Sequence, residues 1–154
     1  MKLSENLTLS EATKSNTAIK YGIDNLPKGQ HLDNLIDTAQ MIFQPIRDYF
    51  GVPIKVTSGY RSESLNAIIG GSKTSQHSKG EALDLDADVF GGITNQEIYE
   101  FVRDHLEFDQ LIHEFGTESN PAWVHISYSA DGNRKQILRA YKNAKNRTQY
   151  KIWW

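Results

Sequence analysis

Three side chains in two distant parts of the chain have the chemistry to bind a metal ion. His77 and Asp84 lie within residues 75–84, which read SQHSKGEALD, and His125 lies within residues 123–128, which read WVHISY. Two histidines and one carboxylate leave the fourth position of a tetrahedral zinc ion free for water, as in catalytic zinc sites. Zinc lowers the pKa of such a water molecule to roughly 7, which makes it a nucleophile at neutral pH. From residue types alone, a zinc site and three ordinary surface or core residues both stay open.

The segments that carry these residues are expected to place them on one polar surface. Residues 82–89 alternate strictly between apolar and polar residues, which is typical of a strand. One face of this strand holds Leu83, Leu85, Ala87 and Val89, and the other holds Asp84, Asp86 and Asp88. A loop that turns at Gly80 would bring His77 back to Asp84. Residues 123–128 alternate in the same way and place His125 on the polar side of a second strand.

Patterns in the rest of the chain predict helices first and strands later. We expect helices over residues 8–15, 32–50, 62–69 and 94–105, and strands over 54–60, 82–89, 109–115, 123–128 and 135–141. Residues 16–30 contain several glycine, proline and asparagine residues and read as a loop. Residues 131–133, with the sequence DGN, predict a hairpin between the last two strands. This order favours an α+β fold with a small antiparallel sheet that carries the metal site.

Length and composition narrow the classes of protein. The 154 residues suit one domain, 1–154, with a core of about 5–141 and a C-terminal tail, 142–154, of uncertain order. There are no cysteines, so a transition-metal site must use His, Asp or Glu. A net charge of -2 gives no reason to expect a nucleic-acid or membrane partner. The N-terminus lacks the apolar stretch of a signal peptide, so we expect the protein to be made in the cytoplasm. We also expect a monomer.

Several segments together resemble the zinc D-alanyl-D-alanine carboxypeptidase family, which includes cell-wall carboxypeptidases, dipeptidases and phage endolysins. The resemblance rests on Ser75-x-His77-x6-Asp84 followed much later by Trp123-Val124-His125. Supporting segments are Gln44-Pro45-Ile46-Arg47, Val56-Thr57-Ser58-Gly59-Tyr60-Arg61-Ser62, and Asn66 with Gly70-Gly71-Ser72. It covers roughly residues 5–130 and is strongest to the small single-domain branch common in phages and prophages.

The resemblance implies a fold, a cofactor and several site residues. The fold would be DD-peptidase/hedgehog-like, and one zinc ion (Zn2+) would be bound by His77, Asp84 and His125. Arg61 would bind substrate and polarise the scissile carbonyl, since a guanidinium suits both a carboxylate and an oxyanion. A surface ion pair is the ordinary alternative for Arg61. Ser75 matches a position that contacts substrate in relatives, although a loop hydroxyl can equally bond nearby backbone.

The general base is where this sequence departs from many relatives. They carry a glutamate three residues before the last histidine, and this chain has Ala122 there. Glu114, on the expected strand 109–115, is our first choice, because a strand fixes a side chain better than a loop does. Glu118, in the loop before Pro121, is an alternative, and so are His113 or no base at all.

The resemblance also implies the substrate, the stem peptide of peptidoglycan. We expect zinc-dependent hydrolysis of D-Ala-type bonds, as a carboxypeptidase or endopeptidase. A phage or prophage lysis protein would act on the wall once a holin released it. The alternatives are a catalytically inactive metal- or wall-binding module, which the absent glutamate keeps open, and a cytoplasmic D,D-dipeptidase.

Overall fold

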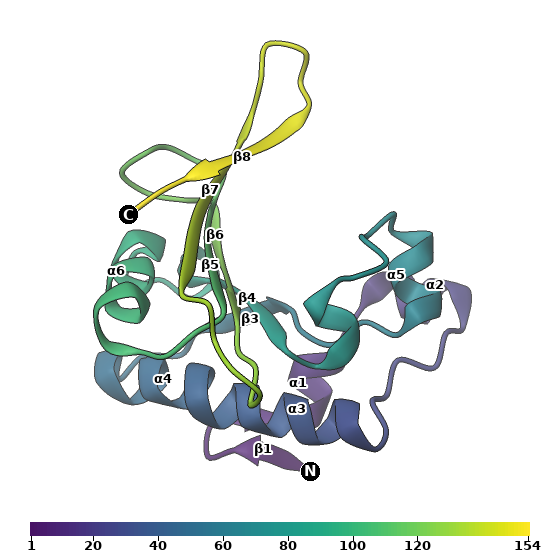
Figure 1. The fold of residues 1–154 in the computed structure, drawn as a ribbon. Helices are drawn as coiled ribbons and strands as arrows, with labels where there is room; N and C mark the ends of the chain where they lie inside the picture. Colours follow the sequence, from purple (N-terminus) through teal and green to yellow (C-terminus); the bar gives the residue numbers. More distant parts are fainter.

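The computed structural model describes all residues from Met1 to Trp154 and is built around a six-stranded sheet (Figure 1). The strands are β3 (Lys55–Ser58), β4 (Ala82–Asp86), β5 (Gln110–Glu114), β6 (Trp123–Ser127), β7 (Gln136–Lys142) and β8 (Thr148–Ile152). Their order in the sheet is β3-β4-β6-β5-β7-β8, and every neighbouring pair is antiparallel except β5 and β7. The expected α+β class with a mostly antiparallel sheet is therefore confirmed.

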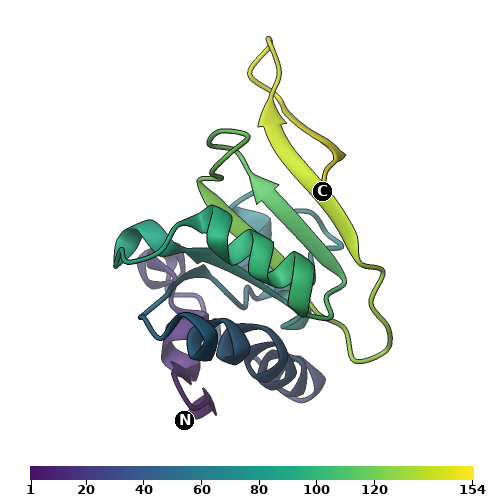
Figure 2. The same ribbon diagram turned by 90° about the vertical axis from the view of Figure 1, so that its left-hand side faces the viewer.

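Helices pack on one face of this sheet and form the core with it. They are α3 (Gln30–Thr38), a π-helical turn (Ala39–Phe43), α4 (Gln44–Phe50) and α6 (Asn95–His105), which lies in front of the sheet in Figure 2. The apolar residues of β4 and β6 are fully buried against them: Leu83, Leu85, Val124 and Ile126. Removal of this apolar surface from water is the main force that holds the layers together. The polar residues of the same strands consequently point to the opposite face.

The expected helix over residues 32–50 is present, with a wider turn in its middle. The π-helical turn ends at Phe43, two residues before Pro45, which is the second residue of α4. Proline has no N–H and its ring clashes with the carbonyl of the residue four positions earlier, Met41, in a regular helix. A wider turn relieves that clash. Gly51 ends α4 in the left-handed conformation and donates its N–H to the carbonyl of Arg47, as the sequence predicts.

The N-terminal part adds small elements below and beside the sheet. They are β1 (Lys2–Ser4), β2 (Leu7–Thr8), α1 (Leu9–Thr13), α2 (Asn16–Tyr21) and α5 (Glu63–Ile68). The prediction that all of 16–30 is loop is wrong for α2. The hydroxyl of Ser15 accepts the N–H of Ala18 and begins this helix, and Gly22 ends it in the left-handed conformation. Six residues are too few for a helical repeat of apolar positions to be visible in the sequence.

The predicted hairpin between residues 123–128 and 135–141 is wrong. β6 and β7 do not pair, because β5 lies between them and runs parallel to β7. Arg134, which follows the DGN turn, forms a two-pronged ion pair with Asp109 at 3.0 and 2.8 Å. The N–H of Gln136 also binds the carbonyl of Asp109. These contacts hold the start of β7 beside the first residue of β5, from which the two strands run parallel.

The strand predicted over residues 82–89 is shorter than expected. It ends at Asp86, whose carboxylate accepts the N–H of Asp88 and begins a 3-10 turn, Ala87–Val89. Val89 is consequently exposed instead of packed in the core. No helix in the protein is long and apolar enough to cross a membrane.

Candidate metal centre

The three predicted metal ligands lie together on the polar face of the sheet. Asp84 in β4 and His125 in β6 are direct partners across the strands, and Asp84 Oδ1 lies 3.0 Å from His125 Nδ1. His77 comes from the 3-10 turn η2 (Gln76–Lys79), and its Nε2 lies 3.3 Å from the same oxygen. One ligand atom from each residue lies within 4.8 Å of the others, so this cluster can hold a metal ion.

Backbone contacts hold His77 in one orientation. Its Nδ1 lies 2.7 Å from the carbonyl oxygen of Gly59, and its own carbonyl accepts the N–H of Arg61. A carbonyl can only accept, so Nδ1 carries a proton, and in the neutral imidazole Nε2 is then free to bind a metal ion beside Asp84. Ser75 begins the turn by accepting the N–H of His77 at 3.2 Å. The ordinary interpretation of the Ser75 hydroxyl, a bond to nearby backbone, is thus observed.

The geometry of the cluster fits a tetrahedral divalent metal. Metal–nitrogen distances of about 2.0–2.1 Å imply roughly 3.3 Å between neighbouring ligand atoms, close to the separations between Asp84 and the two histidines. Nε2 of a neutral His77 and Oδ1 of Asp84 are both acceptors, and a metal ion between them would satisfy both. Nε2 of His125 is buried and has no hydrogen-bond partner. The polar contact of this ring is therefore the one between its Nδ1 and Oδ1 of Asp84.

The charge of Asp84 is stabilised in this setting. Burial by itself acts to raise the pKa of this carboxyl, but His77 and His125 act more strongly in the other direction. The pKa of Asp84 is consequently well below its usual range. A carboxylate that keeps its charge when little exposed is what a metal ligand requires.

Gly80, which ends the turn that carries His77, has no room for a side chain. Its φ of +77° is unfavourable for other residues, and a Cβ would lie 2.3 Å from the carbonyl oxygen of His31 in α3. Gly22 has a similar φ of +63° but nothing within 4 Å. We expect Gly22→Ala to cost about 1 kcal/mol of stability from backbone strain alone. Gly80→Ala should cost about 3 kcal/mol, because α3 must also move.

Urea unfolding of the zinc-free variants measures this difference. Equal losses for Gly80→Ala and Gly22→Ala would show that the close approach of Gly80 to α3 adds nothing to the cost of the substitution.

A cavity of about 760 Å³ opens in front of the metal ligands. It is lined by three other predicted site residues, Arg61, Ser75 and Glu114. The segment that follows α5 contributes Ile69, Ser72 and Thr74, and β8 contributes Thr148 and Tyr150. In Figure 1, α5 lies to the right of the strands and the β7–β8 hairpin lies above them. The structure therefore brings the metal ligands, one free cation and one buried carboxyl to a single cavity.

Glu114 is the last residue of β5 and faces this cavity from the sheet. It is 8% exposed, and it pairs with Trp123, two residues before His125 on the neighbouring strand. Burial raises the pKa of Glu114 to about 7, Asp84 adds to the shift, and His125 opposes it. A carboxyl with a pKa near neutrality can both accept and return a proton, which is what a general base must do.

The two alternative bases lie elsewhere. Glu118 is exposed in the loop between β5 and β6 and does not line the cavity. His113 points to the helix-covered face, where its Nε2 lies 2.9 Å from Gln96 Oε1 and its ring packs on Tyr99. Burial and the nearby Arg139 lower the pKa of His113 to about 4. A neutral histidine on that face has no access to the metal ligands.

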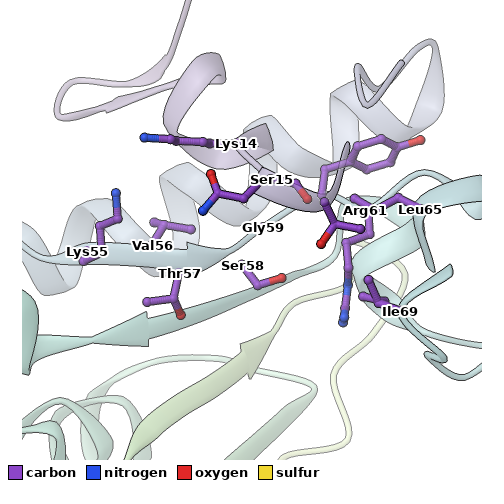
Figure 3. Close-up of a pocket in the computed structure, with 13 residues that line it drawn as sticks. Lys14, Ser15, Lys55, Val56, Thr57, Ser58, Gly59, Arg61, Leu65 and Ile69 are labelled. Carbon is purple, nitrogen blue, oxygen red and sulfur yellow. The ribbon is translucent and has the colours of Figure 1, made fainter. Parts of the chain in front are cut away.

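Arg61 lies between the metal cavity and a second hollow of about 350 Å³ along β3 (Figure 3). Arg61 and Ile69 line both spaces, and Lys14 and Lys55 lie at the other end of the hollow. No carboxylate lies within ion-pair distance of Arg61, and its Nε is buried without a partner. Burial lowers the pKa of Arg61, and the charge of Asp84 opposes the shift. The surface ion pair considered for Arg61 is absent, so its guanidinium is available to a ligand.

Thr148 and Tyr150 in β8 also line the metal cavity, although neither was predicted as a site residue. Both lie in the segment 142–154, which we treated as a tail. The alternation of residues 148–152 was a usable signal, because five residues with a threonine and a tyrosine on one face suit a strand. The segment 143–146, NAKN, supplies the turn between β7 and β8, with Asn146 at a φ of +59°.

A sequence model described as peptidase M15 matches residues 5–127. This range includes Arg61, Ser75, Glu114 and all three metal ligands, and it ends before β7 and β8. No curated protein matches the chain.

Proposed function

The chain belongs to the peptidase M15 family, and from that premise we propose that it uses zinc to hydrolyse D-Ala-type peptide bonds in bacterial peptidoglycan. Its family and its His-Asp-His cluster make it a metallopeptidase. The observation that carries the finer proposal is the position of Glu114 and Arg61 in the cavity of the metal ligands. A base, a cation and a metal site in one cavity are the parts that metal-assisted peptide hydrolysis requires.

Each group has a defined task in this proposal. When bound, zinc supplies Lewis acidity and a nucleophilic water at neutral pH. Arg61 binds the carboxylate or the carbonyl oxygen of the peptide and stabilises the negative charge that develops on that oxygen. A carboxylate oxygen of Glu114 takes the proton of the attacking water and returns it to the leaving amine nitrogen. Ser75 accepts a bond from the backbone of His77 and keeps its own proton, which it can donate to the substrate.

The biological setting that we propose is lysis by a phage or prophage, with the protein acting as a monomer of one domain, 1–154. The support is the resemblance to small single-domain relatives. The substrate would be the stem peptide of the wall, cut by carboxypeptidase or endopeptidase action. Ala122, where many relatives have a glutamate, favours a second candidate, an inactive metal- or wall-binding module.

Release of free amino groups from purified peptidoglycan tests the proposal. We expect release by the zinc-loaded protein, and background release by the chelated protein and by His125→Ala. Activity that survives effective chelation would refute the zinc mechanism. Hydrolysis of free D-Ala-D-Ala without action on the wall would instead identify a cytoplasmic D,D-dipeptidase. Binding without any hydrolysis would identify the inactive module.

Arg61→Lys is expected to lower kcat/KM by about 10- to 100-fold, although the charge is retained. A lysine ammonium cannot form the two parallel hydrogen bonds that a guanidinium forms with a carboxylate. Peptide hydrolysis by Arg61→Lys should be compared with that by Arg103→Lys, whose residue lies in α6 and pairs with its neighbour Asp104. Equal activity of the two variants would remove Arg61 from the proposed mechanism.

A further inference from the structure

The C-terminal hairpin forms one wall of the metal cavity although it lies beyond the family match, which ends at residue 127. β8 is the edge strand of the sheet, and β3, which leads to Arg61, is the opposite edge. The strands that carry Asp84 and His125 lie between these two edges. Arg61 and Tyr150 therefore approach the metal ligands from opposite sides, and both line the same cavity.

A row of paired residues places Tyr150 on the face of the metal site. Trp123 pairs with Glu114, Glu114 pairs with Ala140, and Ala140 pairs with Tyr150. Directly paired residues have their side chains on the same face of a sheet. Ala140 has only a methyl group and is fully buried, so it leaves room for a larger side chain to lie over it. The ring of Tyr150 can therefore lean over Ala140 into the cavity.

The environment of the site changes the pKa of the Tyr150 hydroxyl. Burial raises the pKa of Tyr150, and the carboxylates of Glu114 and Asp84 raise it further. The hydroxyl consequently keeps its proton at neutral pH and is a hydrogen-bond donor. The side chain nevertheless remains 56% exposed, so it is open to a ligand that enters the cavity.

We propose that Tyr150 is a substrate-binding residue, whose hydroxyl donates a hydrogen bond to a carbonyl or carboxylate oxygen of the bound peptide on the side opposite Arg61. The inference rests on the proposed function, because it takes the ligand to be a peptide of the wall. It adds a residue from β8 to a site whose metal ligands, base and Arg61 all lie within the family match. The hairpin is then a part of the peptidase site and not an appendage to it.

Tyr150→Phe tests this, because it removes only the hydroxyl. Tyr141→Phe is the matched control, since Tyr141 lies in the same hairpin but next to Ala140 and thus on the other face of the sheet. The probe is a non-hydrolysable phosphinate analogue of D-Ala-D-Ala, and its Kd is measured by calorimetry with the zinc-loaded proteins. We expect Tyr150→Phe to raise the Kd by about 10- to 100-fold, the effect of one hydrogen bond to a charged group, and Tyr141→Phe to change it less than twofold.

Hydrolysis of wall peptides by the same proteins separates this inference from the proposed function. If the wild type hydrolyses no wall peptide but binds the analogue with a Kd that depends on Tyr150, the proposed function fails and the inference stands. If Tyr150→Phe binds the analogue and hydrolyses peptides as Tyr141→Phe does, the inference is wrong. Failure of the wild type to bind the analogue would also overturn it.

Discussion

Asp84→Asn is expected to abolish peptide hydrolysis and to remove the stabilisation of the protein by zinc. Oδ1 of Asp84 is the atom that faces both His77 and His125, at 3.3 and 3.0 Å. An amide in its place carries no charge and presents either a neutral oxygen or a donor to the metal. Loss of a partner behind a metal ligand already costs about 10- to 100-fold in affinity or activity, and loss of the charged ligand itself should cost more.

Thermal unfolding gives a readout that does not depend on catalysis. A ligand at about 1,000 times its Kd stabilises the folded state by about 4.1 kcal/mol. For a domain of this size that corresponds to a rise in Tm of roughly 8–16 °C. We expect the wild type to show this rise when zinc is added to the chelated protein, and Asp84→Asn to show almost none.

Asp88→Asn is the control for this experiment. It makes the same chemical change four residues away, at an exposed position outside the cluster. It should keep both the rise in Tm and the activity. An Asp84→Asn protein that zinc stabilises as strongly as it stabilises the control would exclude Asp84 from the metal centre.

Local patterns predicted which faces two of the three metal ligands occupy. The alternation in residues 82–86 and 123–127 set the face of Asp84 and His125 without any knowledge of the sheet order. The same alternation placed Glu114 and His113 on opposite faces of β5, which the cavity and the contacts of His113 bear out. The period of a strand, a property of the backbone, was enough to predict these faces, but the assignment of His77, Asp84 and His125 as metal ligands came from the family resemblance.

The failures concern contacts between distant segments. The DGN turn suggested a hairpin between β6 and β7, but β7 pairs with the other edge of β5. The ion pair between Arg134 and Asp109 holds the chain where it passes the start of β5. A turn sequence cannot reveal which strand its far end will join. β8 was missed for a similar reason, since its residues are mostly exposed and its position depends on pairing with β7. Tyr150 reaches the site only through these two long-range pairings.

The two faces of the sheet differ in polarity and in function. The face under the helices is mostly apolar, and a cation on it, Arg139 beside His113, is held by the carbonyls of Phe115 and Thr117. The other face exposes a carboxylate, a carboxyl and two imidazoles to a cavity. Groups arranged for catalysis are often poorly arranged for stability, and Glu114 is the clearest example on this face.

Glu114→Gln is expected to lower kcat by about 100- to 10,000-fold while the affinity for zinc remains, because glutamine cannot take up a proton from water. The remaining activity should also lose the pH dependence that the ionisation of Glu114 causes. In the wild type, kcat/KM should rise with pH as Glu114 loses its proton, with a pKa at or below the value of about 7 found without a metal. A bound cation favours the carboxylate and shifts this limb to lower pH. Hydrolysis measured from pH 4 to 9 tests both points.

Glu118→Gln is the control, since it makes the same change in the exposed loop next to β5. It should leave the rate and the pH profile unchanged. Full activity of Glu114→Gln, together with a loss in Glu118→Gln, would identify Glu118 as the base and leave the metal centre intact.

The same substitution should stabilise the zinc-free protein at high pH. Burial raises the pKa of Glu114 from its ordinary value of 4.5 to about 7, so the folded state favours the protonated form. The stability that this group contributes is fully present below pH 4.5 and is lost as the pH rises through 7. Glutamine stays neutral at every pH, so the variant should match the wild type near pH 4 and exceed it by up to about 3 kcal/mol at pH 8. An equal free energy of unfolding at pH 8 would mean that ionised Glu114 does not destabilise the folded protein. The raised pKa of Glu114 would then be wrong.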